Sequence, residues 1–144
     1  MNPFDPASDV VQTDQTTRPR RNRQSAKKAG SSFERQTADY LKLVLDDETI
    51  DRRVKTGAKD RGDIAGVKTI RGARLVIECK NVARTDLPGW VREATLEAAN
   101  DDAAYGVIVH KRHGVADPAR QFVTMDLETF ALLLQGGPDE LRGL

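Results

Sequence analysis

Three segments of the chain carry apolar residues at helical spacing. The first starts after Ser31, a residue type that caps helices well, and its repeating positions are Phe33, Thr37, Tyr40, Leu41, Val44 and Leu45. The second follows Asp86 and has a proline at an early helical position, where helices tolerate it. The third follows Asp126 and is stopped by Gly136 and Pro138. The pattern therefore predicts helices within residues 31–47, 86–102 and 126–138.

Five shorter segments are typical of strands. Three of them contain β-branched residues and are bounded by glycine or aspartate: residues 49–57, 61–69 and 73–80. The segments 61–69 and 73–80 form a predicted hairpin. Residues 104–112 form an apolar run, and residues 121–127 predict a further strand. A strand–helix–strand crossover after a hairpin predicts an α/β or α+β fold, with a central mixed sheet of about five strands flanked by helices.

Composition limits the class of protein. With 144 residues, 38% of them apolar, the chain can form one core, which we place in a single domain over residues 31–144. The one cysteine, Cys79, cannot form an internal disulfide, and with two histidines it cannot complete a structural zinc site. We find no membrane-spanning run or signal peptide, so we expect a soluble protein that is not secreted.

Residues 1–30 differ from the rest of the chain. They lack apolar periodicity and are rich in Pro, Gln, Ser, Thr and Asn, so we predict a disordered arm. The arm has three acidic residues and six basic ones, and the basic residues all lie in the stretch 18–28, which has no acidic residue: Arg18, Arg20, Arg21, Arg23, Lys27 and Lys28. The arm is either a solvated tail or a segment that binds nucleic acid.

The strand LVIECK, residues 75–80, ends an apolar run in two opposite charges. Glu78 and Lys80 share one face of this strand, and Asp63 lies in the neighbouring strand of the predicted hairpin. Burying unpaired charges costs several kcal/mol, so these groups must pair, bind an ion or reach water. Asp63, Glu78 and the backbone carbonyl of Cys79 are oxygen ligands of the kind that Mg²⁺ prefers. With Lys80 beside it, such a site favours metal-assisted hydrolysis of a phosphodiester.

These residues resemble the motifs of the PD-(D/E)XK nuclease superfamily. The residues concerned are Glu34 on the first helix, Gly62–Asp63 and Glu78–Cys79–Lys80, and over residues 31–125 the layout is most similar to the small archaeal and phage Holliday junction resolvases. The resemblance implies a restriction-endonuclease-like core in which Asp63 and Glu78 bind the metal, Lys80 serves the attacking water and Glu34 completes the site. Gly62 stands where that family usually has proline.

The same resemblance implies cofactor, partners and location. We expect Mg²⁺, for which Mn²⁺ can substitute, and a symmetric homodimer, because a resolvase cuts two opposed strands. The helix around Trp90 and the C-terminal segment ETFALLL are candidate dimer surfaces. The expected compartment is the cytoplasm of a prokaryotic or phage-infected host.

Each motif residue also has a simpler explanation. Glu34 could be the acidic partner of Ser31 in a capping box, and Asp63 could belong to an ordinary turn. Glu78 and Lys80 could form a surface ion pair worth about 0–1 kcal/mol.

Four further polar residues stay outside the predicted site. Glu93 and Glu97 are spaced as on a solvated helix face, although the family often has a polar site residue on this helix. His110 and His113 fit strand-end packing or a phosphate contact.

Basic residues precede Asp63 and follow the apolar strand 104–110. They are Arg52, Arg53, Lys55, Lys59, Arg61, Lys111 and Arg112, and with Arg18, Arg20, Arg21 and Arg23 of the arm they form the predicted DNA-binding set. No segment resembles a recognition helix, so we expect selection by DNA structure. The sequence thus predicts a Mg²⁺-dependent endonuclease for branched DNA such as four-way junctions. Two alternatives are a nuclease of the same fold for flaps, ends or other DNA, and a non-catalytic DNA-binding module.

Overall fold

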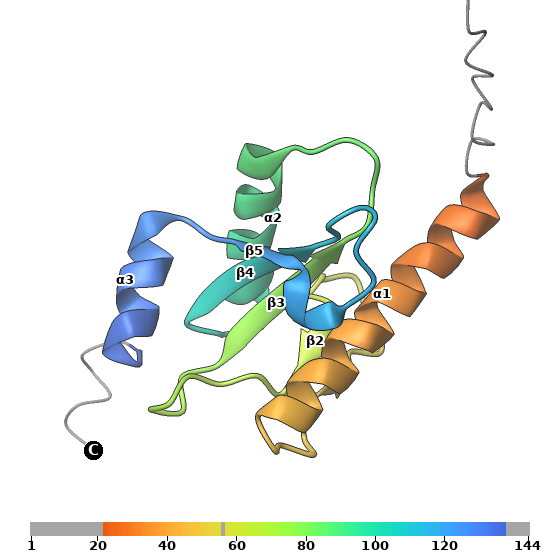
Figure 1. Cartoon of the computed structure of the whole chain (residues 1–144). Helices are drawn as coiled ribbons and strands as arrows, with labels where there is room; N and C mark the ends of the chain where they lie inside the picture. The colour runs from red at the N-terminus through yellow and green to blue at the C-terminus, as the bar shows by residue number, and fades with distance from the viewer. Residues whose placement is uncertain (1–21, 56, 138–144) are drawn as a thin grey trace, which may run out of the picture.

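The computed structural model describes residues 22–55 and 57–137, which form a sheet flanked by helices (Figure 1). In chain order the elements are α1 (Arg23–Val44), β1 (Asp51–Arg52), β2 (Ile64–Ala65), β3 (Leu75–Lys80), α2 (Leu87–Asn100), β4 (Tyr105–His110), the 3₁₀ turn η1 (Pro118–Arg120), β5 (Phe122–Thr124) and α3 (Leu127–Gln135). The predicted order of helices and strands is confirmed, with η1 as an addition.

The sheet is mixed and has five strands in the order β1-β2-β3-β4-β5. The crossover through α2 makes β3 and β4 parallel, and the other neighbouring strands are antiparallel. Ile64 of β2 lies opposite Ile77 of β3, so the register sets Asp63 opposite Glu78. The predicted fold class is therefore confirmed, and so is the hairpin that brings these two carboxylates together.

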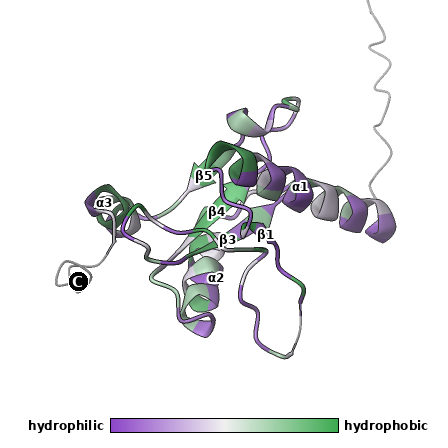
Figure 2. Cartoon of the chain, turned by 90° about the horizontal axis from the view of Figure 1, so that it is seen from below, coloured by the Kyte–Doolittle hydropathy of each residue, from purple (hydrophilic) through white to green (hydrophobic). Residues whose placement is uncertain are grey.

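Helices cover both faces of the sheet. On one face Phe33 and Ala38 of α1 pack in a cluster with Ile64 and Ile77, and on the other Trp90 and Ala94 of α2 pack against Ile108. Figure 2 shows α1 and α2 on opposite sides of the sheet, with the mostly hydrophilic loop that follows β1 on the side of α2. Each large apolar side chain buried in this way contributes about 1.5–3 kcal/mol. None of the helices in the described ranges is long and apolar enough to cross a membrane.

One glycine lets α2 approach the sheet closely. A Cβ at Gly106 of β4 would lie 2.2 Å from the carbonyl oxygen of Ala94, so a larger residue would push α2 away. This close contact sets the distance between α2 and β3, the two elements that carry most of the acidic side chains described below.

The start of α1 differs from the prediction. The N-cap is Asn22, whose Oδ1 accepts a hydrogen bond of 2.8 Å from the amide of Ser25, and Ser31 lies inside the helix. Residues 23–30, Arg23 included, are therefore helical, although we predicted disorder for them. An asparagine cap followed by good helix formers suffices to extend a helix that packs elsewhere, without apolar periodicity of its own. The remaining part of the predicted arm, with Arg18, Arg20 and Arg21, lies outside the described residues.

Strands β1 and β2 are shorter than predicted. Each has two residues, and the polar residues 53–55 and 57–62 between them lie outside the sheet in a loop. This loop is held against α2, where Asn100 donates a hydrogen bond of 2.8 Å to the backbone carbonyl of Asp60. The predicted end of α3 is confirmed, because Gly136 caps it with a φ of 83°.

Candidate active site

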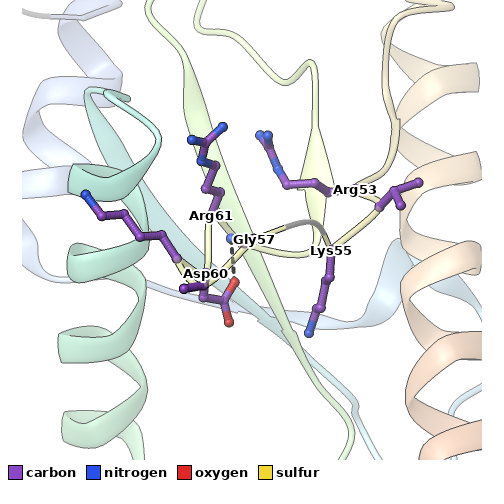
Figure 3. Close-up of a pocket in the computed structure, with 9 residues that line it drawn as sticks. Arg53, Lys55, Gly57, Asp60 and Arg61 are labelled. Carbon is purple, nitrogen blue, oxygen red and sulfur yellow. Dashed lines mark hydrogen bonds between the residues drawn. The ribbon is translucent and has the colours of Figure 1, made fainter.

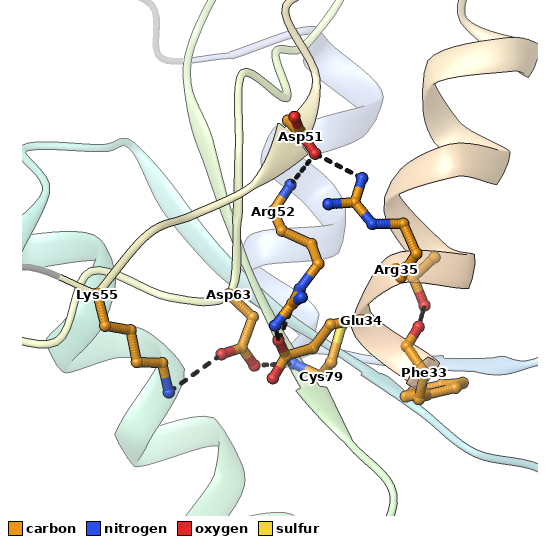
Figure 4. Close-up of polar contacts among 9 residues, drawn as sticks. Phe33, Glu34, Arg35, Asp51, Arg52, Lys55, Asp63 and Cys79 are labelled. Carbon is orange, nitrogen blue, oxygen red and sulfur yellow. Dashed lines mark hydrogen bonds and ion pairs between the residues drawn. The ribbon is translucent and has the colours of Figure 1, made fainter. Parts of the chain in front are cut away.

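Asp63 is buried at the start of β2 and is held in place by the backbone of β3. Its amide donates to the carbonyl of Ile77 at 2.9 Å, and its Oδ2 accepts a hydrogen bond of 2.8 Å from the amide of Cys79. Its Oδ1 has no hydrogen-bond donor and lies 3.5 Å from Nζ of Lys55, whose side chain is mostly exposed (Figure 4). Asp63 is 2% exposed, so turn chemistry at a surface does not explain it.

Gly62 determines where Asp63 lies. Its φ is 89°, and a Cβ at this position would lie 2.4 Å from Cγ1 of Val76. Proline is restricted to a φ near −65°, so it cannot adopt this conformation. The glycine that replaces the proline of the resembled family is therefore required by the backbone of this chain.

Glu78 and Lys80 lie side by side on the face of β3 that is covered by α2. Glu78 is 6% exposed, its Oε1 lies 3.5 Å from Nζ of Lys80, and its Oε2 has no hydrogen-bond donor. The same Nζ lies 2.9 Å from Oε2 of Glu93. The two residues do form an ion pair, but the alternative of a surface pair is wrong, because the Lys80 side chain is also largely buried.

The protonation of the two residues follows from these contacts. Burial disfavours the ammonium of Lys80, but the hydrogen bond to Glu93 and the charge of Glu78 outweigh it and raise the Lys80 pKa. Burial, and then the charge of Asp63, raise the pKa of Glu78. Burial also raises the pKa of the Cys79 thiol, which therefore stays protonated. Lys80 is thus a fixed cation that compensates the charges of Glu78 and Glu93 only in part, since Oε2 of Glu78 has no hydrogen-bond donor.

Glu34 is held by an arginine. Its Oε2 accepts from Nη2 of Arg52 at 2.9 Å and from Nε at 3.2 Å (Figure 4). The capping-box explanation is wrong, because α1 starts at Arg23 and Ser31 is not a cap. Metal binding by Glu34 stays a prediction, and the structure shows the carboxylate engaged by Arg52.

Glu97 was not predicted to belong to the site, yet it lies at its centre. It is 2% exposed, and neither of its carboxylate oxygens has a hydrogen-bond donor. Burial raises the pKa of Glu97. As carboxylates, Glu97 and Glu78 offer only acceptors, so they can hydrogen-bond to each other only by sharing a proton, which would raise the pKa of Glu78 and lower that of Glu97. The available signal was spacing, since Glu97 follows Trp90 by seven residues and so continues its buried stripe.

The loop after β1 adds a third carboxylate. Oδ1 of Asp60 accepts a hydrogen bond of 2.9 Å from the amide of Gly62. Figure 3 shows the side chains of Asp60 and Lys55 extending from one side of the loop, and those of Arg53 and Arg61 from the other. Asp60, Glu78 and Glu97 each place a carboxylate oxygen within 4.8 Å of the other two. Since Asp60 is exposed, this cluster has one side open to water.

The predicted basic residues of the loop fall into two kinds. Nη2 of Arg53 lies 3.0 Å from Oδ2 of Asp101 and so ties the loop to the end of α2. Lys59 and Arg61 are exposed and form no ion pair with other described residues. Together with the exposed Lys55 they are the cations that remain available for phosphates.

The two basic residues after β4 make local contacts. Nζ of Lys111 donates to the backbone carbonyl of Val115, which closes the loop after this strand. The guanidinium of Arg112 lies over the ring of Phe122, 5.4 Å from its centroid. Arg112 is exposed, so it can still reach a phosphate, whereas Lys111 is engaged.

Strand-end packing explains His110. Its ring lies between those of Trp90 and Phe122, at centroid distances of 5.3 and 5.7 Å, and its Nε2 is 2.7 Å from Oγ1 of Thr124. His113 contacts the carbonyl of Val82 at 3.2 Å. Neither histidine belongs to the group of Asp60, Glu78 and Glu97.

The donor set fits a hard divalent cation. Oδ1 of Asp63 and Oε2 of Glu78 are buried, have no hydrogen-bond donor, and belong to residues that lie opposite each other on adjacent strands. Carboxylate oxygens with nearby water are the ligands that Mg²⁺ and Mn²⁺ accept. Comparisons of the chain with protein-family models, with curated proteins and with solved structures found no match, so the interpretation of this site rests on its geometry.

Proposed function

We propose that the protein is a divalent-metal-dependent endonuclease that hydrolyses phosphodiester bonds in branched DNA, with four-way Holliday junctions as its substrate. The observation that carries the proposal is the set of Asp63, Glu78 and Lys80. Two opposed, buried carboxylates each have an oxygen without a donor, and the partly buried ammonium of Lys80 lies beside Glu78. This arrangement is costly for a structural role and suits a site that handles phosphate.

Asp63 and Glu78 are the residues that would hold Mg²⁺ or Mn²⁺. A bound ion of this kind neutralises phosphate charge and lowers the pKa of water. The hydrogen bond from the Cys79 amide fixes Oδ2 of Asp63, and thereby leaves Oδ1 as the oxygen available for a ligand. Gly62 fixes the backbone from which this side chain starts.

Lys80 acts as a donor of hydrogen bonds. Its raised pKa keeps it an ammonium at neutral pH, so it does not serve as a general base. Its Nζ can orient the attacking water or donate to a non-bridging phosphate oxygen, where negative charge grows during the reaction. Glu93, 2.9 Å away, holds the ammonium in this position.

The basic residues beside the site suit contacts with the DNA backbone. Lys55, Lys59 and Arg61 lie on the loop that also carries Asp60, and they surround a hollow lined by residues 53–55 and 57–62. Lys27 of α1 lines a second groove with Arg52 and Lys55, next to Glu34. Contacts of this kind position phosphates without reading bases, which favours recognition of DNA shape.

A junction needs two opposed cuts, so the proposal includes a homodimer with one site in each copy. Trp90 itself is 8% exposed and packs in its own core, so it offers little apolar surface to a second copy. Exposed apolar side chains lie instead on the edge strand β5 and on α3: Phe122, Val123, Leu127, Phe130 and Leu134. We place the dimer surface there, since burying these side chains on both copies would stabilise a two-fold interface.

Cleavage of a DNA panel tests the proposal. Labelled four-way junction, flap and linear duplex are incubated with the full chain in Mg²⁺, Mn²⁺ or EDTA. We expect paired, symmetric nicks on the junction that disappear in EDTA. Equal metal-dependent cutting of all three substrates would indicate a nuclease with a broader substrate. Binding without cutting in either metal would contradict an enzyme and favour a DNA-binding module.

A further inference from the structure

A second group of carboxylates lies next to the proposed catalytic pair. Asp60 of the loop, Glu78 of β3 and Glu97 of α2 have ligand oxygens within 4.8 Å of one another. Among residues 22–55 and 57–137 this is the one acidic group of three or more with such short separations. It shares Glu78 with the proposed catalytic site and contains neither Asp63 nor Glu34.

Glu97 is the member of the cluster that lacks a positive partner. The residue is 2% exposed, and both of its carboxylate oxygens are buried without a hydrogen-bond donor. Lys80 has its Nζ 3.5 Å from Oε1 of Glu78 and 2.9 Å from Oε2 of Glu93, and it forms no ion pair with Glu97. A carboxylate with a purely structural role on a packed helix normally receives hydrogen bonds, because an unpaired buried charge costs several kcal/mol. Something positive therefore belongs between Glu97 and Glu78.

We infer that Asp60, Glu78 and Glu97 bind a second divalent cation, separate from the ion at Asp63 and sharing Glu78 with it. Three carboxylates without nitrogen or sulfur favour a hard cation such as Mg²⁺, Mn²⁺ or Ca²⁺. The site has an entry path, since Asp60 is exposed.

The Asp60 ligand is also positioned in advance. Two hydrogen bonds fix the loop at Asp60. The Gly62 amide donates to Oδ1 of Asp60, and the Asn100 side chain donates to the backbone carbonyl oxygen of Asp60. The inference goes beyond the proposed nuclease function. An ion at this site would bind when no DNA is present, and its binding does not depend on whether the protein cuts DNA.

The competing explanation is a proton shared by Glu78 and Glu97, with no ion. The two explanations differ in the number of metal ions bound. We would titrate the full chain with Mn²⁺ without DNA and count bound ions by electron paramagnetic resonance of the free ion. The variants are Glu97→Gln, Asp63→Asn and, as a control, Glu48→Gln, which changes an exposed glutamate before β1.

We expect two Mn²⁺ ions on the wild type and on the control. Glu97→Gln should lose one ion, and Asp63→Asn should lose the other. Asp60→Asn provides a second variant on an exposed loop residue, and it should weaken the same ion as Glu97→Gln by about tenfold or more. Wild-type stoichiometry and affinity in both Glu97→Gln and Asp60→Asn would overturn the second site. Two bound ions without DNA cleavage would leave this site intact and contradict the nuclease proposal instead.

Discussion

Replacing Glu97 by glutamine should stabilise the protein when no metal is present. Both carboxylate oxygens of Glu97 are buried without donors, and so is Oε2 of Glu78. The glutamine has nearly the same shape, removes one of two facing charges, and offers an amide that can donate to Glu78. A buried charged group without its partner costs about 1–3 kcal/mol or more, so Glu97→Gln should raise the free energy of unfolding by about 1–3 kcal/mol at pH 8 in EDTA.

The gain in the free energy of unfolding from Glu97→Gln should be larger at high pH than at low pH. Burial raises the pKa of both glutamates, so above about pH 4.5, the ordinary value for glutamate, the folded state holds more protons than the unfolded state. Wild-type stability therefore falls as the pH rises through the raised pKa values, whereas the glutamine variant lacks one of the two groups. At pH 5 the wild-type pair is largely protonated in the folded state, and the difference between the proteins should nearly vanish.

Thermal unfolding in EDTA at pH 5 and pH 8 measures this effect, with Glu48→Gln as the exposed control. A gain of 1–3 kcal/mol corresponds to a rise in Tm of about 4–12 °C for a domain of this size. Saturating Mg²⁺ should cancel or reverse this difference, since an ion at 100 times its Kd stabilises the wild type by about 2.7 kcal/mol. A variant no more stable than the wild type at pH 8, or equally stabilised at both pH values, would refute the argument.

Three further predictions concern other parts of the molecule. Gly62→Ala should lower the free energy of unfolding by more than Gly72→Ala in chemical denaturation. Both glycines have a positive φ, but a Cβ would meet another side chain at Gly62 and nothing within 4 Å at Gly72. Equal losses, each about 1 kcal/mol, would contradict this. Lys59→Ala should reduce the slope of log Kd for DNA against log salt by about 0.9, whereas Lys68→Ala, at the opposite end of β3, should leave the slope unchanged. Phe130→Asp should convert a dimer to a monomer in analytical ultracentrifugation, and a wild-type monomer at all concentrations would exclude the proposed α3 surface.

Much of the fold was predictable because periodicity and end signals agree. Asp86 and Asp126 cap the helices as predicted, and the LVIECK run forms the central strand. The start of α1 was not predictable from apolar spacing, because its first turns after Asn22 are mostly exposed. The short extent of β1 and β2 was missed because β-branched residues in 49–57 and 61–69 favour strands locally, whereas hydrogen bonds to α2 hold the loop between them.

The site shows the same division between local and tertiary information. The proximity of Asp63, Glu78 and Lys80 could be predicted for two reasons. Burying charges at the end of an apolar strand costs free energy unless they are paired or bind an ion, and the register of a hairpin sets which residues face each other. Glu97 has four-residue spacing from Glu93, which is typical of a solvated face, and seven-residue spacing from Trp90, which continues a buried stripe; the packing of α2 decides between the two, and Glu97 is buried. Asp60 depends on the conformation of an irregular loop, for which sequence patterns give little guidance.

The central claim is that Asp63, Glu78 and Lys80 carry out metal-dependent hydrolysis of DNA. Single-turnover cleavage of a labelled four-way junction in Mg²⁺ tests it most directly, with Asp63→Asn, Lys80→Met and the remote control Lys68→Met. We predict that both site variants cut at least about 100-fold more slowly than the wild type while Kd for the junction changes little, and that the control cuts at the wild-type rate. Cleavage by Asp63→Asn and Lys80→Met at the wild-type rate would contradict the account.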